Sequence, residues 1–224
     1  GTFTQVSDAQ YPTLTVRGAV YLNGRLYVME PDGTIWNSAE DDFTSWAGTD
    51  LITAEFEADG GVCLAKQGEF VIALGQFTTE AFYDAGNATG SPLAPVQNAV
   101  MLIGCAHANS VAQLENALVW VAQQKGQGST FHKGRFVVVM QGYGSYERIS
   151  TPDVERVLDA DAFTEVYADI LTVSGHVFYI LSLVDSDLTL VYDFKSKLWY
   201  EWSLLTANSA AAITSITGPA SLAT

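Results

Sequence analysis

Histidine is the residue type most often used for metal binding and for proton transfer near neutral pH, and the sequence contains three. His107, His132 and His176 lie far apart in the chain, and no two of them have the spacing of a metal-ligand pair. His176 directly follows a glycine of a predicted hairpin turn, which indicates a turn or strand residue. The histidines therefore give no support to a zinc site.

Carboxylates are the second group that could do chemistry. Glu40, Asp41 and Asp42 are consecutive between two predicted strands, and we interpret them as a solvated loop. Asp185 and Asp187 are close in sequence but lack the ladder of acidic positions and the glycine of a calcium-binding EF-hand loop. A glycosidase uses paired carboxylates that meet in space, so the sequence leaves such a pair open.

Nucleotide-binding and nucleophile motifs are also missing. Gly142 and Gly144 lie in a glycine-rich stretch, but a third glycine of the dinucleotide pattern and a following helix are absent. The sequence has no Gly-x-Ser-x-Gly motif and no phosphate-binding loop. We therefore predict no catalytic, cofactor-binding or metal-ligating residue, and no cofactor.

The two cysteines, Cys63 and Cys105, each lie in an apolar run, "GVCLA" and "LIGCA". Their spacing matches no metal motif. We predict two reduced thiols that pack in the core as small apolar side chains; a disulfide is possible but is not required.

Composition limits the class of protein. The 224 residues are 48% hydrophobic and 16% charged, which is enough apolar content to bury a large core and argues against disorder. The net charge of −15 makes a basic, phosphate-binding surface unexpected. No apolar stretch approaches the roughly 18 residues of a membrane span, and residues 1–10 lack the pattern of a signal peptide. Because the sequence does not begin with Met, we expect a processed or partial segment of a longer protein.

The elements that would have to position any site are short strands separated by tight turns. Asn23-Gly24, Asp32-Gly33, Gln67-Gly68, Glu115-Asn116 and Ser174-Gly175 each separate two apolar or alternating runs. Asn-Gly suits a type I′ hairpin turn, in which both central residues need positive φ. Further turns are predicted near Asp185-Ser186-Asp187 and at Lys195-Ser196-Lys197.

These hairpins recur at regular intervals. The residues predicted to begin the second strand of each unit are Arg25, Glu69, Ala117 and His176, which are 44, 48 and 59 residues apart. A period of roughly 40–50 residues with about four strands is typical of β-propeller blades. The longer last interval contains the one predicted helix, near 151–159, with Thr151 as N-cap, Pro152 at the first helical position and Val154, Val157 and Leu158 on one face.

Several strands, such as "FVIALG", "ALVWVA" and "RFVVVM", are apolar on both faces. A blade that is covered on both sides by neighbouring blades needs such strands, whereas a β-sandwich, the alternative fold, more often shows alternation. We therefore predict an all-β protein, a β-propeller that is incomplete in this chain, with residues 1–204 forming blades. The uncharged residues 205–224 are predicted to form a closing strand or an extended arm.

Aromatic residues are numerous and are predicted to serve packing. Trp36 is expected to lie between blades. As a strand, "KLWYEWS" places Trp199 and Glu201 on one face and Tyr200 and Trp202 on the other. A core or subunit interface is favoured over a ligand-binding platform here.

An ordered set of phrases carries a family resemblance: "DGTIWNSAEDDFTSWAGTDLITAE", "TTEAFYDAGNATGSPL", "IGCAHANSVAQLENALVWVA", "YERISTPDVERVL" and "GHVFYILSL". Over residues 18–204 the chain resembles the tail hub or nozzle proteins of short-tailed bacteriophages, also called packaged-DNA stabilisation proteins. The family's members are typically longer than this chain, so we expect the remaining blades or a tip to lie outside it.

The resemblance implies a structural virion protein rather than an enzyme. Six copies would form a ring below the portal and adaptor, which retains packaged DNA and lets it pass at ejection without tight binding. The resemblance also implies contacts with other tail proteins and assembly in the cytoplasm of the bacterial host. A protein assembled in that compartment needs no disulfide, and this sequence requires none.

Two other function classes remain open. A propeller hydrolase acting on glycans would need an arginine or carboxylate cluster at the propeller mouth, and the ten basic residues show no cluster in sequence. A glycan-binding or lectin-like propeller without chemistry is the second alternative.

Overall fold

The computed structural model describes residues 6–54, 57, 59–126, 132–203, 205–207 and 210–212. Its chain forms four antiparallel sheets in sequence order, as predicted. The first sheet contains β1 (Ala19–Leu22), β2 (Arg25–Met29), β3 (Thr34–Ala39) and β4 (Asp42–Thr53). The second contains β5 (Gly61–Gln67), β6 (Phe70–Gly75), β7 (Thr79–Asp84) and β8 (Leu93–Pro95).

The third sheet has an extra short strand, and a helical insertion separates it from the fourth. It contains β9 (Gly104–Cys105), β10 (Ala112–Leu114), β11 (Ala117–Lys125), β12 (His132–Gln141) and β13 (Glu147–Arg148), with the 3₁₀ helix η1 (Ala108–Ser110) between β9 and β10. The helix α1 (Pro152–Ala160) precedes the fourth sheet. This sheet contains β14 (Val166–Val173), β15 (His176–Leu183), β16 (Leu188–Asp193) and β17 (Leu198–Trp202), and is followed by a hairpin of β18 (Leu205–Ala207) and β19 (Ala210–Ala212).

The predicted turns explain where the strands begin. Asn23 and Gly24 have φ values of 48° and 78°, and Ser174 and Gly175 have 51° and 76°, as a type I′ turn requires. The turn after β5 lies one residue later than predicted, because Gln67 still pairs with Phe70. Gly68, with φ of 57°, is then the first central residue of the turn, so β6 begins at Phe70 instead of Glu69.

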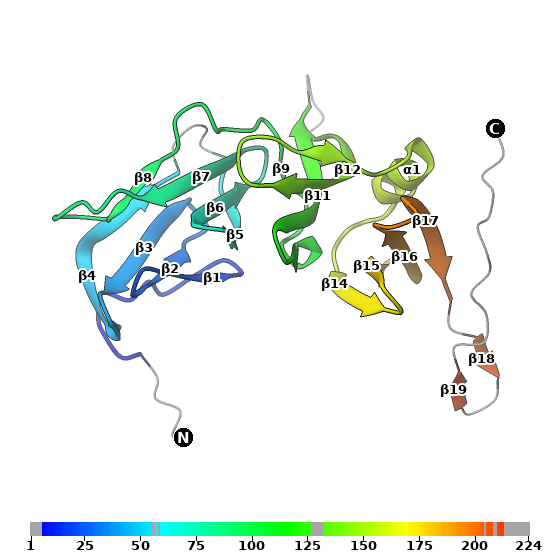
Figure 1. Cartoon of the computed structure of the whole chain (residues 1–224), viewed down its shortest axis with the longest axis horizontal. Coiled ribbons are helices and arrows are strands. Elements are labelled where there is room, and N and C mark those ends of the chain that lie inside the picture. The colour runs from blue at the N-terminus through cyan, green and yellow to red at the C-terminus, as the bar shows by residue number, and fades with distance from the viewer. Residues whose placement is uncertain are drawn as a thin grey trace.

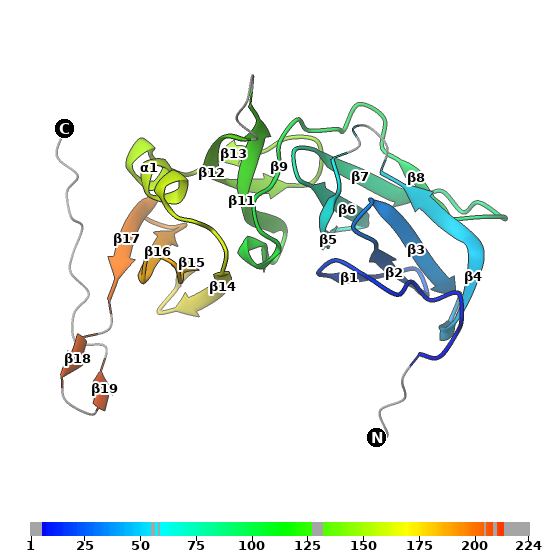
Figure 2. The same ribbon diagram turned by 180° about the vertical axis from the view of Figure 1, so that it is seen from behind.

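The four sheets stand side by side in an arch (Figure 1; Figure 2 from behind). In both views β1 and β14 lie on the concave side of the arch, and β4 and β17 lie on the convex side. Serial packing of four-stranded sheets is the arrangement of propeller blades and differs from the two facing sheets of a sandwich. The sandwich alternative is therefore wrong.

An apolar core lies between each pair of neighbouring sheets. In the second sheet, Val71 and Ala73 join the core shared with the first sheet, whereas Ile72 and Leu74 join the core shared with the third. Because successive residues of a strand point to opposite faces, β6 is apolar at every position and is buried on both sides. The third sheet repeats this pattern, with Trp120 and Val138 on one side and neighbouring valines on the other.

The helix prediction is also confirmed. Thr151 is the N-cap, its hydroxyl accepts a hydrogen bond from the backbone N–H of Val154, and Pro152 occupies the first turn. Val154 and Leu158 are buried in the core between the third and fourth sheets. The helix thus packs against the core between the third and fourth sheets. Neither α1 nor the other described helix has the length and apolar content of a membrane span.

Trp36 does not lie between two of the described sheets. Its neighbour Ile35 is fully buried in the core shared with the second sheet, so strand alternation turns Trp36 to the opposite face. There it is half-buried, and its indole N–H donates a 2.7 Å hydrogen bond to Glu30 Oε2. Of the predicted arm, residues 208–209 and 213–224 lie outside the described residues.

Candidate functional site

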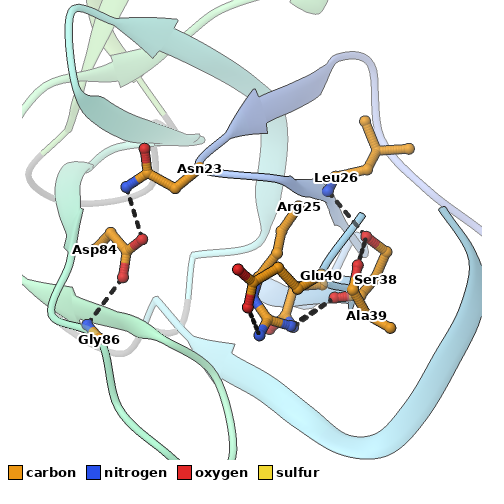
Figure 3. Close-up of polar contacts among 9 residues, drawn as sticks. Asn23, Arg25, Leu26, Ser38, Ala39, Glu40, Asp84 and Gly86 are labelled. Carbon is orange, nitrogen blue, oxygen red and sulfur yellow. Dashed lines mark hydrogen bonds and ion pairs between the residues drawn. The ribbon is translucent and has the colours of Figure 1, made fainter. Parts of the chain in front are cut away.

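Polar side chains gather where the hairpins of the first and second sheets meet (Figure 3). The amide of Asn23, in the β1–β2 turn, donates a 2.8 Å hydrogen bond to Asp84 Oδ2 at the end of β7. The other oxygen of Asp84 accepts a 2.9 Å hydrogen bond from the backbone N–H of Gly86. The Asp84 carboxylate therefore links two blades and has no nucleophile or base beside it in this group.

The acidic run beside these residues forms a turn. Asp41 has φ of 56° between β3 and β4, and Glu40 pairs with Arg25 at 3.4 Å between Oε2 and Nη2 (Figure 3). Arg25 also donates to the backbone carbonyl of Ser38. Asp42 Oδ1 accepts hydrogen bonds from the hydroxyl and the backbone N–H of Thr44, which lower the pKa of this carboxyl. Local partners thus occupy Glu40 and Asp42, in agreement with a solvated loop.

The second acidic pair is also part of a turn. Asp185 accepts hydrogen bonds from the Thr164 backbone N–H, at 2.7 Å, and from its hydroxyl, at 2.6 Å. These bonds hold the pKa of Asp185 below its ordinary value. Asp185 and Asp187 both lie in the β15–β16 turn, where Asp187 has φ of 50°. The hydrogen bonds of Asp185 to Thr164 connect this turn to the residues that precede β14.

The histidines lie on different sheets and have structural partners. The His107 ring accepts a hydrogen bond from the backbone N–H of Asn109 and so caps η1, and burial lowers its pKa. His176 lies 2.7 Å from Asp193, measured between Nδ1 and Oδ2. Burial alone would raise the pKa of Asp193, but hydrogen bonds from Lys195 N–H and His176 outweigh it and lower that pKa. The side chain of His132 lies outside the described part of the chain.

Cys63 and Cys105 are buried in the core between the second and third sheets and are both free thiols, as predicted. Burial raises the pKa of Cys63 to about 11 and that of Cys105 to about 12. A thiol is a nucleophile only as the thiolate, so both groups are inert near neutral pH. Among the residues that the structure describes, no group of three or more His, Cys, Asp or Glu side chains could hold a metal ion.

A shallow groove of 810 Å³ opens between the first and second sheets on the side of β4 and β8. Its lining is mainly apolar, and Glu80 supplies its one carboxylate. Gly142 and Gly144, with φ of 79° and 74°, lie in the β12–β13 turn and not in a phosphate loop. None of these features brings a base next to a nucleophile.

Most of the described basic side chains form ion pairs or hydrogen bonds within the protein. Arg25, Lys125, Arg148 and Arg156 pair with carboxylates. The Arg17 guanidinium donates to the carbonyl of Ala108, and that of Arg135 donates to those of Leu158 and Asp161. Three other lysines with described side chains, Lys66, Lys195 and Lys197, lie on two different sheets. The described surface therefore carries no cluster of free cations that would hold a nucleic acid backbone.

Serial four-stranded sheets with apolar cores between them define a β-propeller, in which the polar groups described above form turns and links between blades. Among solved structures, the computationally designed Ika4 protein has a TM-score of 0.48 at 13% identity, with 86% of this chain and 99% of that chain covered. BamB from Moraxella catarrhalis has a TM-score of 0.28 at 13% identity, with 79% and 69% covered. No curated protein matches the chain.

The family model described as "Bacteriophage P22 Gp10, beta-propeller" matches residues 1–213. The chain therefore belongs to this family of phage tail stabilisation proteins, and the predicted resemblance is confirmed. Membership places it among the structural proteins of the virion, which associate with other virion proteins.

Proposed function

We propose that the protein is a nozzle component of the phage tail, which forms a ring around the DNA exit channel below the portal and adaptor. In this role it helps to retain packaged DNA and lets it pass at ejection. Membership of the P22 Gp10 propeller family is the observation that carries the proposal. Six copies would close the ring by heterologous contacts between identical subunits, and assembly would take place in the host cytoplasm.

The charge distribution supports a channel that DNA passes without tight binding. Affinity for DNA grows with each phosphate that a free Lys or Arg neutralises, because condensed counterions are released. Here the net charge is −15, and six of the ten basic side chains are paired with carboxylates or donate to backbone carbonyls. The surface would repel the duplex at distances within the Debye length.

The blades would act as a rigid body, with contacts to neighbours made by the insertions. Residues 1–204 would form this body, and residues 205–224 a closing element or arm. The helix near 151–159 presents Asp153 and Arg156, which pair at 2.7 Å, on its exposed side. This insertion is the surface we assign to neighbouring tail proteins.

Subunit-resolved electron microscopy of purified particles tests the proposal directly. We expect a ring of this chain below the adaptor, and we expect particles lacking the protein to lose their DNA after packaging. A complemented mutant serves as control. Full, stable heads without the protein, or its absence from tails, would refute the proposal.

A second measurement addresses DNA binding by the purified chain. Anisotropy of a labelled duplex should show no binding at physiological salt, whereas a variant with Glu40, Asp41 and Asp42 all changed to Lys should bind at low salt.

A third measurement tests the glycan alternative. Release of products from host surface polysaccharide by the purified chain would favour a glycan-acting propeller instead.

A further inference from the structure

The turn between β1 and β2 has the chemistry of a modification site. It is formed by Asn23 and Gly24, the only Asn-Gly pair in the sequence, and the Asn23 side chain is exposed. In such a pair the backbone nitrogen of the glycine can attack the side-chain amide carbon of the asparagine. Glycine permits this attack because it has no Cβ to hinder the approach.

The reaction is a deamidation that needs water alone as co-reactant. A bond forms between the Gly24 nitrogen and Asn23 Cγ, and the Gly24 N–H proton leaves with the side-chain amide nitrogen as ammonia. Water then opens the resulting succinimide ring at one of its two carbonyl carbons. The product is aspartate or isoaspartate, and both carry a carboxylate where the amide was.

Asp84 of the second sheet holds the Asn23 side chain in its unreacted form. The Asn23 amide donates a 2.8 Å hydrogen bond to Asp84 Oδ2, and Figure 3 shows the side chain pointing toward Asp84. A hydrogen bond to a charged acceptor is stronger than one between neutral groups. Because the amide carbon must turn toward the Gly24 nitrogen to react, this bond has to break first. The contact between the two sheets therefore slows the reaction.

The product is incompatible with that contact. A carboxylate cannot donate a hydrogen bond, so deamidation replaces a donor–acceptor pair with two like charges at the same place. Asp41 adds to the repulsion, since a Cβ on Gly24 would lie 2.9 Å from its Oδ1. The cation beside the turn, Arg25, already pairs with Glu40. Isoaspartate also lengthens the backbone of a two-residue turn whose φ values of 48° and 78° fit the unmodified chain.

We propose that Asn23 is a deamidation site, that its hydrogen bond to Asp84 slows the conversion, and that the conversion opens the junction between the first and second sheets. The chain thus carries an irreversible change that weakens one contact between blades with age.

Peptide mapping by mass spectrometry of the folded 224-residue chain, incubated at mildly alkaline pH, tests the site and the role of Asp84. Asn98 is the internal reference, because it is also exposed and has φ of 60°, but Ala99 follows it. We expect aspartate and isoaspartate to accumulate several-fold faster at Asn23 than at Asn98. Asp84→Ala should accelerate the conversion of Asn23 several-fold and leave Asn98 unchanged.

Three results would overturn the proposal: equal conversion at Asn23 and Asn98, a rate at Asn23 that Asp84→Ala leaves unchanged or lowers, and an acceleration that Asn98 shares. The last result would assign the effect to general unfolding. If Asp84→Ala does not fold, Asp84→Asn retains the size of the side chain and removes its charge. It should accelerate the conversion of Asn23 in the same direction, again with Asn98 unchanged.

A charge swap tests the consequence for the junction. Asn23→Asp reproduces the aspartate product, and both residue types tolerate the left-handed backbone of the turn. This variant should unfold at a lower urea concentration than the parent. Adding Asp84→Asn should restore most of the loss, because the amide introduced at position 84 then donates to the carboxylate at position 23. A parental midpoint for Asn23→Asp, or a double variant no more stable than it, would refute the opening of the junction.

Discussion

The amide of Asn23 donates a 2.8 Å hydrogen bond to Asp84 Oδ2 and so ties the first hairpin of the first sheet to the second sheet. The two residues are 61 positions apart in the chain. Asn23 also has φ of 48°, a conformation that Asn adopts more readily than most residues. One side chain therefore serves both the turn within a blade and the link between blades.

A double-mutant cycle separates these two roles. Asn23→Ala should destabilise the fold by about 1–3 kcal/mol, because it loses the hydrogen bond and places Ala in the left-handed region. Asp84→Ala keeps the turn residue and removes the acceptor. The coupling energy of the pair in urea unfolding should be about 0.5–1 kcal/mol, and a coupling of zero would show that the bond contributes nothing.

The positions of the blades were predictable because local turn chemistry determines them. The second strands of the first, third and fourth units begin at Arg25, Ala117 and His176, as predicted. Each of these residues directly follows a two-residue turn, so the turn determines where the strand begins. The predicted start of the second unit's second strand, Glu69, was wrong by one residue, because Gly68 takes the first central position of the preceding turn. Turn type is decided by backbone angles, which the residue pair limits but does not fix.

Contacts between blades could not be predicted from the sequence, because they depend on how the sheets pack. The orientation of Trp36 depends on which neighbour takes the core face, and the partner of Asn23 depends on how two sheets pack. β9 and β13 have only two residues each, so their pairing is set by β11 and β12 and has no periodic signal of its own. The hydrogen-bond partners of Asp84 and Asp185 likewise depend on how turns and sheets pack, so spacing in the sequence could not predict them.

The capping role of Thr151 gives a second prediction. Its hydroxyl accepts a hydrogen bond from the backbone N–H of Val154, one of the donors without a partner in the helix. Thr151→Ala should lower the free energy of unfolding by about 0.5–2 kcal/mol, whereas Thr151→Ser should remain close to the parent. Chemical denaturation measures both, and equal loss in the two variants would argue against capping.

Arg135 gives a third prediction, for the docking of α1 on β12. Its guanidinium Nη1 lies 2.9 Å from the carbonyl oxygens of both Leu158 and Asp161, and the group stacks 4.5 Å from the centre of the Phe163 ring. Lysine has a single ammonium and no planar group to stack, so Arg135→Lys should cost about 1.5–3 kcal/mol.

Hydrogen exchange of the α1 amides gives the local readout for this variant. We expect faster exchange in α1 and unchanged exchange in β2 and β6. Arg156→Lys, whose side chain is exposed on α1 and pairs with Asp153 of the same helix, is the matched control and should change stability by less than about 1 kcal/mol. An Arg135→Lys chain with parental exchange in α1 would contradict the prediction.

Tyr179 links the fourth sheet to η1 and predicts how stability changes at high pH. Its buried hydroxyl donates a 2.7 Å hydrogen bond to the carbonyl of Ser110, and burial raises its pKa well above the ordinary value of 10.0. The folded chain thus keeps a proton that the unfolded chain loses. The stabilisation is fully present below about pH 10 and is lost as the pH rises further.

Tyr179→Phe should therefore lower stability by about 1 kcal/mol at neutral pH, through loss of the hydrogen bond. Above about pH 10 its stability should fall less steeply than that of the parent, so that the two curves approach each other. Part of the alkaline loss should remain, because burial also raises the pKa of Tyr27 to about 12 and that of Cys63 to about 11. Urea unfolding from about pH 7 to about pH 11, with the exposed Tyr21→Phe as control, measures these slopes; parallel curves for parent and Tyr179→Phe would show that this phenol does not carry the pH dependence.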